Sequence, residues 1–308
     1  MKVNYLKSLF FVAFAAASYG VLATFVRLSY NDGYTTAEVT FSQAVLGLLG
    51  LIILHGFSKN KKENKEKKYA LSDKLHLVLC GTSFGLTSTF YYLAVHYGIP
   101  VSICIVLLMQ AVWMGALVDF IINHKKPTLV EIVAIVTILL GTLLATNLIN
   151  ESHVQLNATG VIFGILAALS YTFSMFTSNK IALTMPSALR SVYLLVGATL
   201  MVSLIWAHAL ITQPFHFSIF YTWGIILAVF GTILPPFLFT KGMPIVGIGI
   251  GSIIASLELP VSVMMAKFVL NEKVTLLQWL GIVLILIAIV LLNLGLIIPK
   301  RFKKIKNK

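Results

Sequence analysis

The sequence is poor in charged residues. Only 11% of its 308 residues are Asp, Glu, Lys or Arg, while 58% are apolar and the mean hydropathy is +0.95. In a typical soluble protein, roughly a quarter of all residues are charged. Most of the surface of this protein must therefore face something other than water, which excludes an ordinary soluble domain.

Cysteines and clustered metal ligands are also scarce. Cys80 and Cys104 both fall inside apolar runs, which excludes a disulfide framework, and no metal or cofactor site is expected. Intramembrane enzymes need paired acids, a His-Glu-x-x-His run or a serine beside a base. Asp119, His124 and Glu131 are predicted to lie near the inner surface, scattered and unpaired. We therefore expect no enzymatic activity.

Acidic residues are outnumbered by basic ones, 10 against 23, which gives a formal net charge of +13. The basic residues lie between apolar runs and lack the interleaved aromatics of a base-stacking surface, so nucleic acid is not an expected partner. The densest run, residues 59–68, is predicted to be a cytoplasmic loop that attracts anionic lipid. Membrane lipids are therefore expected partners.

Long apolar segments are what the sequence has in abundance. Each is about 20 residues long, enough to cross a hydrocarbon core of about 30 Å. They predict an all-α polytopic membrane protein with ten transmembrane helices. Turns at residues 98–100 and 242–244 separate the third helix from the fourth and the eighth from the ninth. The predicted helices span residues 8–28, 37–57, 74–96, 100–122, 128–147, 158–180, 187–211, 219–241, 245–268 and 274–298.

The positions of the basic residues orient these helices. With ten helices and a cytoplasmic N-terminus, only Arg27, Lys267 and Lys273 of the 23 basic residues fall on the outer side. Basic residues accumulate on the cytoplasmic side of membrane proteins. The prediction is a multi-pass protein of the cell (inner) membrane with both termini in the cytoplasm.

The two halves of the chain resemble each other. FAAASY at 14–19 matches LAALSY at 166–171, and FIIN at 120–123 matches FVLN at 268–271. The matches predict two five-helix repeats, residues 1–150 and 151–308, that together form one transmembrane domain. Because five is odd, the second repeat starts on the opposite side of the membrane. Such inverted repeats give a protein two mirror-related conformations, as alternating access requires.

The repeats and three motifs resemble the EamA-like family of the drug/metabolite transporter superfamily. The motifs are LELPV at 257–261, LNEKVT at 270–275 and QWLG at 278–281. The resemblance implies a transporter of amino acids, nucleobases, nucleotide sugars or drugs. The sequence departs from the family pattern at residues 18–20, where a Trp-Gly is frequent, at Gln43, where an arginine is frequent, and at His124, where a glutamate is expected.

Glu258 is the leading candidate for a functional residue. It is predicted to lie near the midplane of the ninth helix, where an ionised acid is costly unless it faces a cavity. Pro260 cannot donate to the Ser256 carbonyl, which leaves polar backbone free nearby. Glu258 is predicted either to bind a proton or a substrate cation, or to be a protonated structural acid bonded to a Ser or Tyr.

Other polar residues at membrane depth complete the candidate site. Gln110 is the repeat counterpart of Glu258, with Trp113 one turn further along; it either grips substrate or joins helices. Pro235 and Pro236 interrupt the eighth helix, which indicates either a transport site or a fixed kink. The remaining candidates carry hydroxyl groups, which in membrane helices also bond their own backbone: Ser18, Tyr19, Tyr91, Ser170, Tyr171, Ser174 and Ser178.

The sequence thus predicts a secondary transporter that moves a small amino-acid-like, nucleobase-like or drug-like molecule by alternating access. A proton is the candidate coupling ion, and a homodimer is a candidate assembly. The alternative from another class is a channel or lipid scramblase with a polar transmembrane path.

Overall fold

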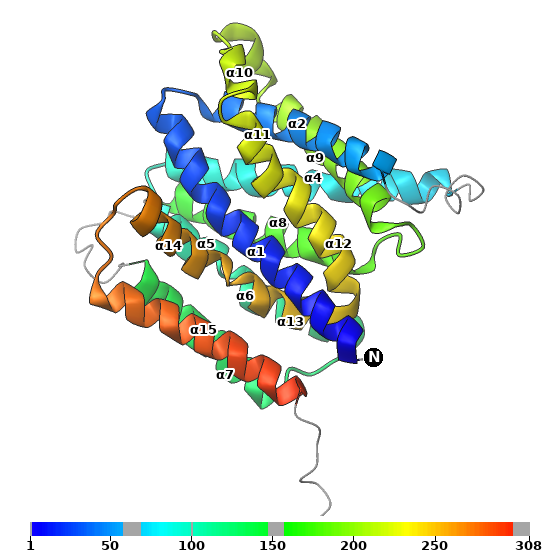
Figure 1. The fold of residues 1–308 in the computed structure, drawn as a ribbon, viewed down its shortest axis with the longest axis vertical. Helices are drawn as coiled ribbons and strands as arrows, with labels where there is room; N and C mark the ends of the chain where they lie inside the picture. Colours follow the sequence, from blue (N-terminus) through cyan, green and yellow to red (C-terminus); the bar gives the residue numbers. More distant parts are fainter. Residues whose placement is uncertain (1, 58–68, 100, 147–156, 298–308) are drawn as a thin grey trace, which may run out of the picture.

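The computed structural model describes residues 2–57, 69–99, 101–146 and 157–297, and no strand occurs among them. Long helices run between two faces of the molecule (Figure 1). We call the face where α1 begins the amino-terminal face, and the opposite one the distal face. The elements of the first half are α1 (Lys2–Asn31), α2 (Thr36–Phe57), α4 (Leu71–His96), α5 (Val101–Leu108), α6 (Ala111–Asn123) and α7 (Leu129–Ala145).

The second half repeats this order with more interruptions. Its elements are α8 (Ala158–Lys180), α9 (Ser187–Ile205), α10 (Ala207–Thr212), the 3-10 turn η2 (Phe217–Phe220), α11 (Gly224–Leu227), the π-helical segment η3 (Ala228–Ile233), α12 (Leu234–Val246), α13 (Ile248–Ala255), α14 (Glu258–Val269) and α15 (Leu276–Ile297). The α5–α6, α11–η3–α12 and α13–α14 segments each form one interrupted rod.

In the described part of the chain, eight rods are long and apolar enough to cross a membrane. Two further apolar helices, Leu129–Ala145 and Leu276–Leu292, are shorter. These two stretches are α7 and the part of α15 that ends at Leu292, in the last helix of each half. The expected all-helical, multi-span architecture is therefore confirmed. The predicted count of ten transmembrane helices is matched by eight rods of sufficient length and two shorter apolar helices.

Three predicted boundaries were wrong. The turn expected at residues 242–244 lies at Gly247, whose φ is 86°, because α12 accommodates Pro244 within its last turn. The fourth helix is not continuous but breaks between α5 and α6. The seventh helix ends at Ile205, and α10 continues in a new direction.

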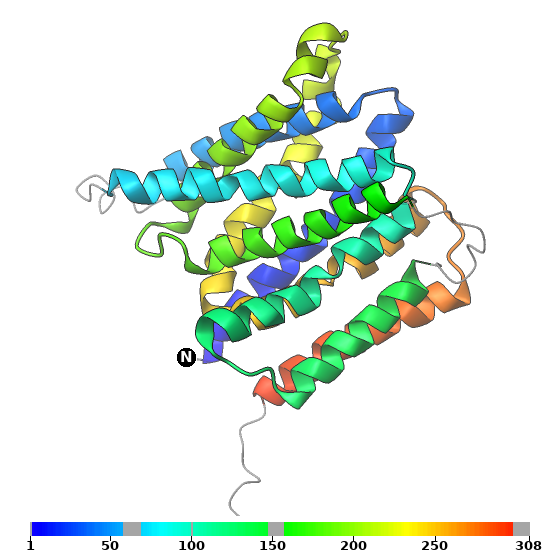
Figure 2. The same cartoon turned by 180° about the vertical axis from the view of Figure 1, so that it is seen from behind.

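The rods form two layers flanked by two helix pairs (Figures 1 and 2). Helix α1 and the α11–α12 and α13–α14 rods lie on one side, whereas α4, α8 and the α5–α6 rod lie on the other. Helices α2 and α9 flank one end, and α7 and α15 pair at the other. The largest hydrophobic core lies between the layers and includes Met175, Phe239 and Met243.

Glycines allow the helices to approach closely, because without a hydrophobic driving force membrane helices associate through tight packing. Gly81 and Gly197 each face the backbone of the other helix where α4 crosses α9. Gly141 and Gly281 face each other where α7 crosses α15. Any larger residue at these positions would push the helices apart.

Candidate transport site

Two helix breaks at equivalent positions of the two halves define the candidate site. The α5–α6 rod breaks at Met109–Gln110, and the α13–α14 rod breaks at Ser256–Leu257. Pro260 lies in the first turn of α14, where its missing N–H is tolerated. Gln110 directly precedes α6, and Glu258 is the first residue of α14. Each break therefore carries one long polar side chain.

The two broken rods lie side by side. The Ser252 hydroxyl of α13 donates to the Val112 carbonyl of α6 at 3.0 Å, and Gly115 of α6 packs against the same serine. Gly249 packs against Asp119, so α6 and α13 run antiparallel. With a rise of 1.5 Å per residue, both breaks lie within roughly 10 Å of this contact.

One tyrosine contacts the Glu258 carboxyl group and two more lie near it. The Tyr171 hydroxyl donates to Glu258 Oε2 at 3.3 Å, and Tyr19 and Tyr91 lie within electrostatic range of the carboxyl group. The ring of Tyr19 meets that of Tyr171 edge-on at 6.0 Å, and Phe239 lies 6.2 Å from Tyr19. Among the described residues, no cationic side chain pairs with Glu258. The Glu258 carboxyl group is thus suited to bind a proton or the cationic group of a ligand.

The side-chain amide group of Gln110 forms hydrogen bonds only with residues three and four positions away in the described part of the chain. Its Nε2 donates to the Val106 carbonyl at 3.0 Å, and its Oε1 accepts from Trp113 Nε1 at 2.9 Å. The Val106 carbonyl belongs to the last turns of α5, where the break leaves backbone acceptors without their helical donors. In this conformation, Gln110 and Trp113 stabilise the first break with neutral groups.

Pro235 and Pro236 follow the π-helical segment η3 and lie in the first turn of α12. Prolines remove backbone donors from the preceding turn, which leaves carbonyl groups there without their helical partners. Ser18 of α1 donates to one of these carbonyls, Phe230 O, at 2.8 Å. The prolines therefore mark an interruption that contacts α1 directly.

Ser170 lies at the repeat position equivalent to Ser18 and makes a similar contact. Its hydroxyl donates to the Ser83 carbonyl of α4 at 2.9 Å, and Ser174 bonds the Ser83 hydroxyl at 2.8 Å. The Ser178 hydroxyl is buried and has no hydrogen-bond partner in the part of the chain that the structure describes. These three serines thus lie at helix contacts in this conformation, whereas Tyr171 on the same helix reaches Glu258.

Arg190 is buried, although the sequence places it among the basic residues of the cytoplasmic segments. Its side chain is 2% exposed, and it donates to the carbonyls of Thr177, Ser178 and Ile181 at the end of α8 and to Thr240 in α12. Thr240 is four residues before Pro244, which has no N–H to offer this carbonyl. Arg190 thus fastens α8 to α12. The sequence did contain a signal for this burial, because Arg190 lies inside the predicted helix of residues 187–211.

Glu38 is a second buried charge that the sequence analysis did not identify. Its carboxylate accepts from Thr35 N at 2.7 Å and from His216 N at 2.6 Å, and His216 Nδ1 lies 2.8 Å away. Thr35 and Glu38 form the reciprocal contacts of a capping box at the start of α2. The Thr-x-x-Glu spacing could have indicated this role.

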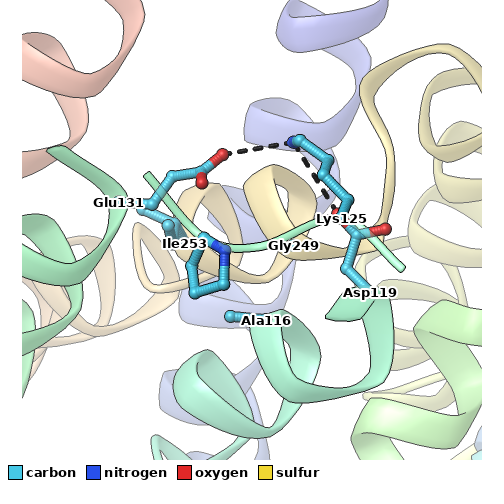
Figure 3. Close-up of a pocket in the computed structure, with 7 residues that line it drawn as sticks. Ala116, Asp119, Lys125, Glu131, Gly249 and Ile253 are labelled. Carbon is cyan, nitrogen blue, oxygen red and sulfur yellow. Dashed lines mark hydrogen bonds and ion pairs between the residues drawn. The ribbon is translucent and has the colours of Figure 1, made fainter. Parts of the chain in front are cut away.

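The expectation that the acids near the amino-terminal face are unpaired was wrong. Lys125 lies 3.8 Å from Asp119 and 3.2 Å from Glu131, and joins the end of α6 to the start of α7 (Figure 3). His124 is not part of this cluster and occupies a left-handed conformation after α6, with φ of 50°. The sequence could not show the pairing because the turn between the helices decides where Lys125 points.

The structure has a small cavity at the amino-terminal face and a larger groove on the distal side. The cluster around Lys125 encloses a cavity of only about 10 Å³, which holds no more than one water molecule. On the distal side, a groove of about 290 Å³ lies among α2, α4 and α9–α10, with Thr36, Tyr92 and Trp206 in its wall. The ring of Tyr92 packs 6.0 Å from that of Tyr91.

Comparisons with known proteins agree with this architecture. No curated protein matches the sequence. Twenty-eight chains of solved structures match the fold. One of them, titled "Crystal structure of protein", has a TM-score of 0.76 at 12% identity over 94% of this chain and 98% of its own.

The model of the EamA-like transporter family matches the sequence twice, at residues 6–147 and 158–294. The two matches cover nearly the whole chain, one in each half. The chain belongs to the EamA-like transporter family.

Proposed function

We propose that this protein is a secondary transporter that moves a small molecule across the membrane by alternating access. Its ten helices would span the membrane as two inverted five-helix repeats. The observation that carries this proposal is the pair of adjacent helix breaks, one in each half, with Glu258 at one and Gln110 at the other. Discontinuous helices near the midplane, at the interface of two repeats, are typical of transporter binding sites.

The pseudo-two-fold axis would pass between Tyr19 and Tyr171. These tyrosines occupy equivalent positions in the 14–19 and 166–171 motifs, and their rings contact each other. Helix α1 begins at the amino-terminal face, whereas α8 begins at the distal face (Figure 2). Inverted repeats predict both the contact between the two tyrosines and the opposite directions of α1 and α8.

We propose that the amino-terminal face is cytoplasmic. This face carries Lys7, Lys125, Lys180 and Lys241, in agreement with the excess of basic residues expected there. The distal groove would then open to the exterior.

In this proposal, Glu258 is the group that binds the proton or the cationic part of the substrate. Tyr19, Tyr91 and Tyr171 would provide aromatic faces and hydroxyls around it, since a cation over an aromatic ring is stabilised by the quadrupole of the ring. The groove beside Tyr92 would lead to this site from outside.

The test uses purified protein in proteoliposomes. A thermal-shift screen against amines, amino acids and nucleobases would first identify a compound that binds, and uptake of that compound would then be measured. We expect saturable uptake that is accelerated by the same compound on the opposite side. Non-saturable flux would indicate a channel, and movement of fluorescent phospholipid between leaflets would indicate a scramblase.

The role of Glu258 is tested by Glu258→Gln, with Asp73→Asn at the start of α4 as the matched control. We expect Glu258→Gln to lower uptake at least about tenfold, a change of about 1.4 kcal/mol in the barrier, and to remove its dependence on pH. The control should retain both. Unchanged pH dependence in Glu258→Gln would exclude Glu258 as the proton-binding group.

A further inference from the structure

Two polar contacts at opposite faces join the same pair of elements in the two halves. At the distal face, Arg27 near the end of α1 forms an ion pair with Glu272, just after α14. At the amino-terminal face, Lys180 at the end of α8 donates to Asn123 Oδ1 at the end of α6, at 2.7 Å. Helices α1 and α8 are the first of each half, and α14 and α6 are the second parts of the two broken rods.

These contacts therefore occupy equivalent places in the two repeats. Each connects the first helix of one half to the end of the broken rod in the other half. Together they lie on opposite sides of the two helix breaks. A transporter that exposes its site to one face at a time must separate these elements at one face while they stay together at the other.

The contact at the amino-terminal face has additional support. Asn123 Nδ2 donates to Asp119 Oδ1 at 2.6 Å, and Lys125 connects Asp119 to Glu131. Asp119 is only 7% exposed and packs against Gly249 at the start of α13. The contact thus extends over α8, α6, α7 and α13 and borders the 10 Å³ cavity of Figure 3.

The contact at the distal face lacks this support. The side chains of Arg27 and Glu272 are 60% and 39% exposed, so water competes for both. Lys267 occupies the position equivalent to Asp119, and its Nζ lies over the Trp279 ring at 4.7 Å rather than in a network with Glu272. The distal groove lies at this same face.

We propose that each of these two contacts holds the helices together at one face of the protein, and we call the contacts latches. The amino-terminal latch is Lys180–Asn123–Asp119, and the distal latch is Arg27–Glu272. Lys180 and Asn123 are exposed as well, but the buried Asp119 and Glu131 support the amino-terminal latch. For this reason it is the stronger latch, and the empty protein rests with that face closed and opens more readily at the distal face. This inference rests on the proposed alternating access and adds the residues that bias it.

The experiment measures distances between spin labels and needs no substrate. In a Cys80→Ser/Cys104→Ser background, one pair of labels at Leu129 and Leu183 reports on the amino-terminal face. A second pair at Asn31 and Leu276 reports on the distal face. All four positions are exposed at or beside helix ends, outside the latches.

We expect Asn123→Ala to add a population with a longer distance between the two labels at the amino-terminal face. The distance between the two distal labels should stay unchanged. Glu272→Gln should lengthen only the distal pair, and the swap Arg27→Glu/Glu272→Arg should restore it. Lys126→Ala and Lys273→Ala, exposed cations in the same two loops, should change neither pair. Melting temperatures would exclude variants that fail to fold.

The proposal is overturned if Asn123→Ala leaves the amino-terminal distances unchanged, or if either substitution moves both pairs equally. These outcomes are separate from those of the transport assay. Saturable uptake with unresponsive distances would retain the transporter and remove the latches. Responsive distances without saturable uptake would retain the latches and remove the proposed function.

Discussion

The two broken helices have the same geometry and different chemistry. Tyr19 and Tyr171 are repeat counterparts that touch, and Ser18 and Ser170 both donate to a carbonyl of the opposite half. At the breaks this equivalence ends, because Glu258 is an acid that Tyr171 bonds, whereas Gln110 is a neutral amide satisfied by its own segment. Duplication accounts for the scaffold, and divergence at one pair of positions supplies a single charge.

Moving the acid to the other break is the strongest test of this asymmetry. We expect Glu258→Gln/Gln110→Glu to transport at least about tenfold more slowly than wild type, since a positioned donor or acceptor contributes a few kcal/mol. The reason is that the acid at position 110 would lose the hydroxyl of Tyr171. Uptake by proteoliposomes measures this, with Gln110→Glu alone as the control. Full recovery in the double variant would show that the two breaks are interchangeable.

The first helices of the two halves differ in how closely they approach the opposite break. An added methyl group at Gly20 would overlap the Glu258 carbonyl oxygen, whereas the repeat counterpart of Gly20 is Thr172. We expect Gly20→Ala to destabilise the protein by about 1–3 kcal/mol through overpacking. Gly56→Ala, which meets open space, is the matched control. Thermal unfolding in detergent compares the two, and equal melting temperatures would contradict the close contact.

The equivalent serine contacts should have similar energies. Ser18→Ala and Ser170→Ala each remove one hydrogen bond to a carbonyl of the other half, worth about 1 kcal/mol. We expect similar drops in melting temperature for the two variants. A much larger effect of Ser18→Ala would show that the π-helical segment depends on this bond more than α4 depends on its counterpart.

The smallest effect is expected at the neutral break. Trp113→Phe keeps the ring and removes the donor to Gln110, a loss of about 0.5 kcal/mol at a partly exposed site. Uptake should fall by no more than about threefold. A loss as large as that of Glu258→Gln would mean that the indole N–H contacts substrate during transport.

The sequence was sufficient to predict the all-helical, multi-pass architecture and the family, whereas the ten spans and the inversion of the repeats stay predictions. Hydropathy located the apolar rods, and the repeated motifs located the two halves, because both properties are local in sequence. The contacts of Arg190 were not predictable, since its partners are carbonyls exposed by the end of α8 and by Pro244 far along the chain. The Lys125 cluster was missed for a related reason, because a turn brings together side chains that their spacing alone keeps apart.

The pairing of α7 with α15 also constrains how the chain is assembled. Helix α7 completes the first half, yet it packs mainly against α15, where Gly141 faces Gly281 near the end of the second half. The partner that covers most of α7 is therefore the last helix of the chain to be synthesised. The first half thus depends on the end of the chain to cover its own last helix.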